Sequence, residues 1–139
     1  MKKKTILILA VSVLIIGAGV LAYTFRKSPN SVSKIKPDFI VEPTMFVGDF
    51  LTDEINANKK YLDKTVQFTS KLVEIQPNDD NKTTLSFEGN DMGNISCLFD
   101  NAELKKTSVE IGKMYIVKGK CSGYILDVVL TKCALVNKN

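Results

Sequence analysis

The chain has 139 residues, which leaves room for one compact domain beside an N-terminal segment. Its formal net charge of +4 is concentrated at the start: residues 1–27 hold five Lys and Arg and no acid, and from residue 28 onward 14 Lys face 15 Asp and Glu. This near-neutral remainder argues against a surface for polyanions, and the absence of His excludes hydrolytic triads and His-ligated zinc.

Residues 1–25 have the composition of a membrane signal. Three lysines precede an almost unbroken apolar run over 6–25, and about 20 helical residues span about 30 Å, the thickness of a hydrocarbon core. We predict a single-pass transmembrane anchor with its N-terminus in the cytoplasm, because the apolar region of a signal peptide is usually only about 7–15 residues long. The alternative is a signal peptide that is cleaved after the small residue Ala22, which releases a secreted or periplasmic protein. Both alternatives place the following domain outside the cytoplasm.

A linker and a helix follow. Residues 26–43 contain three Pro and three Ser, a composition typical of an extended linker rather than a packed element. Over 44–61 the apolar residues recur at steps of three and four, which predicts one amphipathic helix whose buried face holds Val47, Phe50, Leu51, Ile55 and either Tyr61 or Leu62.

After Leu62 the apolar period changes to two, which predicts a five-stranded barrel over 64–136. The first three strands are marked by alternating bulky residues, namely Val66, Phe68 and Leu72, then Leu85 and Phe87, then Ile95, Cys97 and Phe99. A short helical piece near 102–106 separates them from the strands 114–122 and 127–136. This order of elements is that of an oligonucleotide/oligosaccharide-binding (OB) barrel. We therefore predict a mainly β protein whose residues 44–139 form an OB-fold domain.

Several segments resemble the tRNA_anti-like family of bacterial OB-fold proteins. They are the helix-to-strand corner 57–66, the third strand 95–99 and, most clearly, the closing hairpin within 112–133. The resemblance covers about 44–136 and implies an OB fold and an exported or lipid-anchored location, but no activity. This chain departs from the lipoprotein members because no cysteine follows the apolar run, so its anchoring would depend on the helix over 6–25.

The outward side of the strands has little that suits a nucleic acid. Phe68, Phe87 and Phe99 share the phase of the core, which leaves no aromatic platform for bases. The opposite phase is rich in hydroxyls and carries one lysine, and Tyr124 lies in the turn before the last strand, where OB domains often contact ligands. We expect any ligand contact at Thr69, Lys71, Thr84, Ser86, Ser96 and Tyr124; the alternative is a solvated face, with the Tyr124 ring packed on the barrel rim.

The three cysteines leave their pairing open. Cys97 and Cys121 lie on the inward phase, whereas alternation does not place Cys133. In an exported protein a disulfide could join Cys121 to Cys133 in the closing hairpin, or Cys97 to Cys133 across adjacent strands. Without His to activate a thiol, and without paired C-x-x-C spacing, we expect no catalytic residue, no metal and no cofactor.

The sequence thus predicts a non-catalytic binding or interaction module outside the cytoplasmic membrane, with an envelope protein, a peptide or a glycan as ligand. The alternative function is that of a single-stranded nucleic-acid-binding protein of the OB type, which only the fold supports. An enzyme is not expected, because the sequence has no His to serve as a general base or to activate a thiol.

Overall fold

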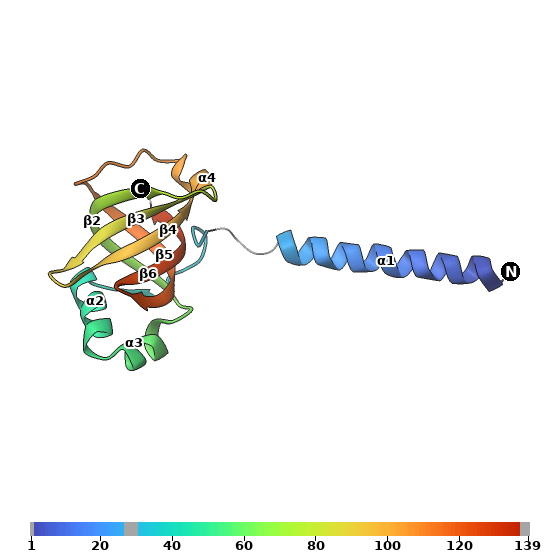
Figure 1. Ribbon diagram of the computed structural model, residues 1–139, viewed down its shortest axis with the longest axis horizontal. Coiled ribbons are helices and arrows are strands. Elements are labelled where there is room, and N and C mark those ends of the chain that lie inside the picture. Colours follow the sequence, from blue (N-terminus) through green and yellow to red (C-terminus); the bar gives the residue numbers. More distant parts are fainter. Residues whose placement is uncertain (1, 27–30, 137–139) are drawn as a thin grey trace.

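The computed structural model describes residues 2–26 and 31–136, which form an N-terminal helix and a β-barrel (Figure 1). In chain order the elements are α1 Lys2–Arg26, β1 Phe39–Ile40, α2 Pro43–Thr52, α3 Glu54–Tyr61, β2 Thr65–Pro77, β3 Lys82–Asn90, β4 Gly93–Asp100, α4 Asn101–Leu104, β5 Met114–Ile125 and β6 Asp127–Val136.

Five strands close the barrel in the order β2–β3–β4–β6–β5. β5 returns to β2 along an antiparallel register that joins residues 114–120 to residues 65–71. β4 and β6 are parallel and pair only over 95–97 and 128–130. The strand order, with α4 between β4 and β5, is that of an OB barrel, so the predicted fold class is confirmed.

The core consists of the alternating bulky residues that the strand pattern predicted. Phe87 and Phe99 are completely buried, as are Leu85 and Ile95. Alternation fails on β6 because Lys132 adopts a left-handed conformation with φ 52°, and two residues of β6 there face one residue of β5. After this bulge Cys133 points inward, which explains why its position could not be predicted from a simple period of two.

The single helix expected over 44–61 is wrong, because the segment forms two helices. α2 and α3 are separated by Asp53, whose backbone has φ −155° and ψ 86°. The Asp53 carboxylate accepts a hydrogen bond from the backbone N–H of Asn56 at 3.1 Å and thereby caps α3. The change of direction also leaves Ile55, which we expected on the buried face, 70% exposed.

Removal of this cap should destabilise the domain. We expect Asp53→Ala to lower the free energy of unfolding by about 1 kcal/mol, because the N–H of Asn56 loses its acceptor. Denaturant titration measures the effect. Asp80→Ala is the control, since this loop carboxylate is exposed and has no hydrogen bond within residues 31–136; its change should stay below about 0.5 kcal/mol. Equal losses in the two variants would contradict the capping role.

The segment 31–35, which we call the strap, packs on the outside of the barrel. Val32 is only 3% exposed, and its N–H donates to the carbonyl oxygen of Lys132 at 2.8 Å. The buried Lys118 Nζ donates to the carbonyl oxygen of Ser33 at 3.0 Å. The expected extended linker over 26–43 is therefore wrong at the strap. One apolar side chain and two backbone groups attach the strap to β5 and β6. Residues 27–30 of that linker lie outside the described residues.

α1 is apolar, and its apolar stretch packs on nothing within residues 2–26 and 31–136. Its stretch Lys3–Ala22 lies near the N-terminus, has a mean hydropathy of 2.7 and has none of its surface buried. A helix of this length and composition is able to cross a membrane or to act as a signal sequence.

Candidate ligand-binding surface

The structure brings together three of the predicted contact residues on the outer wall of β3 and β4. Ser86 faces Ser96 across the two strands, and Thr84 is two residues away on β3. Ser86 is only 8% exposed, so Thr84 and Ser96 are the two hydroxyls that this wall presents. Both of these hydroxyls already have partners: Ser96 Oγ donates to Asp127 Oδ2 at 3.3 Å, and Thr84 Oγ1 accepts from Asn78 Nδ2 at 3.1 Å. This wall is polar and ordered, and it suits a ligand with its own donors and acceptors.

Lys71 and Thr69 contribute less to this wall than predicted. Lys71 Nζ is paired with Glu88 Oε2 at 2.9 Å, which neutralises its charge. Thr69 lies opposite Ile116 on the other side of β2, where it lines a separate cavity of about 260 Å³ together with Thr107. The β3–β4 wall therefore carries neither an unpaired lysine from β2 nor an aromatic ring.

Tyr124 is half-buried. Its ring stacks on Phe50 of α2, with the ring centroids 6.1 Å apart and the planes 16° from parallel. Phe50 in turn contacts Tyr61 of α3. Tyr124 therefore helps to hold the helices on the end of the barrel, which is the packed alternative of the sequence analysis.

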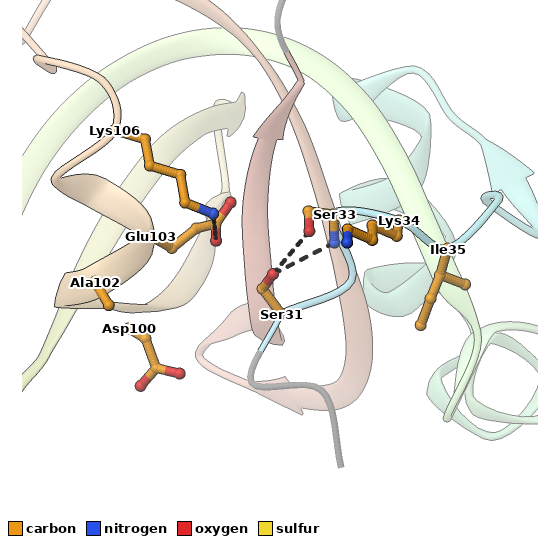
Figure 2. A pocket seen from close by; sticks show the side chains of 8 residues that line it. All are labelled: Ser31, Ser33, Lys34, Ile35, Asp100, Ala102, Glu103 and Lys106. Carbon is orange, nitrogen blue, oxygen red and sulfur yellow. Dashed lines mark hydrogen bonds and ion pairs between the residues drawn. The ribbon is translucent and has the colours of Figure 1, made fainter. Parts of the chain in front are cut away.

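A cleft lies between the strap and α4 (Figure 2). Its volume is about 460 Å³, within the range of small-molecule sites. The strap forms one wall and the segment around α4 forms the other, and the lining residues are Ser31, Ser33, Lys34, Ile35, Asp100, Ala102, Glu103 and Lys106. Sequence reasoning missed this site because it treated residues 31–35 as a free linker. The only signal in the sequence was the apolar Val32 among polar residues, and Val32 is the side chain that packs.

The cleft is balanced in charge. Lys106 Nζ pairs with Glu103 Oε2 at 2.9 Å, and Ser31 Oγ donates to Ser33 Oγ at 3.2 Å. Lys34 and Asp100 have no ion pair or hydrogen bond through their side chains within the described part of the chain. Asp100 also lines a second hollow of about 220 Å³ between β4 and β6, so the cleft continues toward the β3–β4 wall. This surface offers a free ammonium and a free carboxylate, an arrangement that suits a short polar segment better than a polyphosphate.

Comparison with known proteins agrees with this architecture. A model of the tRNA_anti-like family matches residues 1–135. The chain belongs to the tRNA_anti-like family. The match includes α1, so it extends further than the resemblance over 44–136 noted in the sequence. No curated protein matches the chain.

Two solved structures are similar to this tRNA_anti-like protein. A proposed nucleic acid-binding lipoprotein from Klebsiella pneumoniae is similar over 70% of this chain and 92% of its own, with a TM-score of 0.57 and 15% sequence identity. A proposed aspartyl-tRNA synthetase from Leishmania major is similar over 88% of this chain and 26% of its own, with a TM-score of 0.48 and 8% identity. The first of these likenesses supports the shared fold.

The three cysteines of this tRNA_anti-like protein are buried and unbridged in the structure. Burial raises the pKa of the Cys97 thiol, and the neighbouring Cys133 thiol raises it further. Burial also raises the pKa of the Cys121 thiol, and a hydrogen bond with the backbone of Gly123 partly offsets this rise. The structure thus places Cys133 beside Cys97, the second of the two pairings considered, and the disulfide itself stays a prediction.

These raised pKa values predict a loss of stability in alkali. With reductant present, the unfolded thiols ionise above about pH 8.5 while the folded thiols stay protonated, so the free energy of unfolding should hold below that pH and fall above it. The slope should reach about 1.4 kcal/mol per pH unit for Cys97. Denaturant titrations from pH 7.5 to 9.5 measure it, and the double variant Cys97→Ala and Cys121→Ala should show a flatter slope. Identical slopes would contradict the prediction.

Proposed function

We propose that this tRNA_anti-like protein is a non-catalytic binding module that α1 holds on the outer side of the cytoplasmic membrane. The observation that carries the proposal is the Lys3–Ala22 stretch, which is long, apolar and without any packing partner in the described structure. Lysines before the stretch favour a cytoplasmic N-terminus, because positive charge is retained on that side of the membrane. The near-neutral barrel then follows on the outer side.

Binding rather than catalysis is supported by the chemistry of the barrel surface. The sequence has no His, and the thiols of all three cysteines are buried in the core. The carboxylate of Glu103 in the cleft is paired with Lys106. Asp100 therefore has no second unpaired carboxylate in the cleft with which to share general acid and general base roles. What the cleft and the β3–β4 wall do provide is hydroxyls, the carboxylate of Asp100, and the ammonium groups of Lys34 and Lys82, which have no ion pair among the described residues. These groups suit a peptide segment or a glycan of an envelope partner.

Topology can be tested on the full chain. Alkaline phosphatase fused after Asn139 should be active, since it folds only outside the cytoplasm, and β-galactosidase at the same position should be inactive. Mass spectrometry of the protein from the membrane fraction should give the mass of the full chain. The mass of a chain that starts directly after Ala22 would indicate a cleaved signal peptide. An inactive phosphatase fusion together with an active β-galactosidase fusion would refute display outside the membrane.

Single-strand nucleic-acid binding is the second candidate, and the OB topology shared with the Klebsiella lipoprotein supports it. The β3–β4 wall argues against it, because Lys71 is neutralised by Glu88 and the phenylalanines of β2, β3 and β4 are buried. Titration of the detergent-purified full chain with labelled oligonucleotides at 50 and 200 mM salt decides between the two. Tight binding that weakens steeply with salt would favour the nucleic acid.

A further inference from the structure

Four large apolar side chains project into solvent at the end of the barrel away from α4. Met45 is 69% exposed, Met92 76%, Ile125 78% and Leu126 84%. They come from three segments that are distant in sequence: the start of α2, the β3–β4 turn, and the β5–β6 turn. We call these four residues the apolar tip. Large side chains that stay this exposed in a cluster mark interaction sites more often than single exposed residues do.

The three segments lie close together in the structure. Asn90 Nδ2, in the β3–β4 turn, donates to the carbonyl oxygen of Thr44 at 3.5 Å. A Cβ added to Gly93 would lie 3.4 Å from Val47 Cγ1 of α2 and 3.6 Å from the carbonyl oxygen of Leu126. Figure 1 shows α2 beside the β3–β4 turn, at the opposite end of the barrel from α4. The apolar tip is thus one rigid surface.

Leu126 is held in a costly conformation. Its φ is 64°, in the left-handed region where hairpin turns normally use Gly, Asn or Asp. Burial of the Leu126 side chain does not offset this cost, because among the described residues it is the most exposed of the large apolar side chains. A strained, solvent-facing leucine does not help the fold, and strain of this kind is typical of functional sites.

The segments that form the rim of the apolar tip are acidic, and the lysines near the rim come from neighbouring elements. The segments 42–53, 88–94 and 121–128 hold six acids and no Lys or Arg. Asp49 and Glu88 have lysine partners on neighbouring elements, whereas Glu42 and Asp91 are exposed and have none among the described residues. An anionic lipid surface or a nucleic acid would be repelled by this rim, and a second copy of the tip would oppose acid with acid.

We propose that the apolar tip docks into a protein partner whose surface has an apolar pocket rimmed by Lys or Arg. The proposal deepens the proposed function, since it assigns the partner of the displayed module to the class of envelope proteins. Interfaces of this kind combine a desolvated apolar centre with a complementary charged rim, and the partner's cations supply the charge that this end of the barrel lacks.

The test is site-specific photo-crosslinking of the full chain in intact cells. A photoreactive residue replaces Leu126 or Met92, and in controls it replaces Met114 or Ile111, which are 62% exposed near the start of β5, the end opposite Ile125. We expect one protein adduct at the two tip positions and none at the control positions. The purified partner should be crosslinked in an apolar pocket next to Lys or Arg, and Glu42→Lys with Asp91→Lys should weaken its binding at least tenfold.

A lipid adduct, an adduct to a second copy, an oligonucleotide adduct or no adduct at the tip would each overturn the proposal. So would a partner whose binding is unchanged by the double charge reversal. The phosphatase fusion separates this result from the proposed function: an inactive fusion with a clean tip adduct refutes display outside the membrane but retains the docking surface.

Leu126→Asn separates binding from folding. Asn tolerates the left-handed conformation, so the thermal midpoint should be unchanged or higher, because the strain is relieved and no buried side chain is lost. Affinity for the crosslinked partner should fall at least tenfold. Met114→Asn at the other end of β5 should leave affinity unchanged. A fall in both stability and affinity for Leu126→Asn would show a structural role and contradict the proposal.

Discussion

Replacement of Phe87 by alanine should lower the free energy of unfolding by about 3–5 kcal/mol, the usual cost of removing a fully buried phenylalanine. The Phe87 side chain has no exposed surface, and its ring meets that of Phe68 edge to face at a centroid distance of 5.7 Å. The variant leaves a cavity between β2 and β3 that a closed barrel cannot fill by moving one strand. Chemical denaturation followed by circular dichroism measures the loss.

Met114→Ala is the matched control for this prediction. Met114 also lies on a barrel strand, but it is 62% exposed, so its removal should change the free energy of unfolding by less than about 0.5 kcal/mol. If Phe87→Ala lost no more than Met114→Ala, the inward phase assigned to β3 would be wrong. The outward position of Thr84 on β3 depends on that phase.

Charges placed in the middle of α1 should remove the protein from the membrane. Leu14→Arg together with Ile15→Asp introduces two groups that each cost about 2.5–3.5 kcal/mol at the centre of a membrane-spanning helix. Carbonate extraction of the membrane fraction should release the variant into the supernatant, unless the variant does not accumulate in the cells at all. The unmodified chain should stay in the pellet. The control is Ile111→Arg, which adds a charge to an exposed position of the barrel and should not change the distribution.

A carbonate-resistant variant with the mass of the full chain would contradict a membrane-spanning α1. A short mature chain in the unmodified protein, with export lost in the variant, would instead identify α1 as a cleaved signal. The two readings of the apolar helix are therefore separated by the same experiment.

The barrel was predictable because its information is local. A period of two places Phe68 and Leu85 inward whatever the neighbouring strands do, and the short helix after the third strand selects the OB order of strands. The break at Asp53 was not predictable from periodicity, because α2 and α3 each present apolar residues at helical spacing. The bulge at Lys132 was hidden for the same reason, since left-handed lysine has no sequence signature.

The candidate surface was predictable only in part. Alternation put Ser86 and Ser96 on the outside, but it could not reveal that Ser96 is bonded to Asp127, or that Lys71 is neutralised by Glu88. These partners lie far apart in the chain and meet only when the barrel closes. The cleft was missed because its first wall is the strap, whose attachment depends on a carbonyl made available by the β6 bulge at Lys132.

The strap also limits the distance between the barrel and the end of α1. Val32 and Ser33 are fixed to β6 and β5, so in the anchored form only six peptide units separate Arg26, the end of α1, from Val32, a reach of at most about 22 Å. A partner embedded in the same bilayer would be confined to the same thin layer as the barrel, which raises its effective concentration there. A contact too weak to survive dilution in a cell extract would then be well populated in the intact membrane.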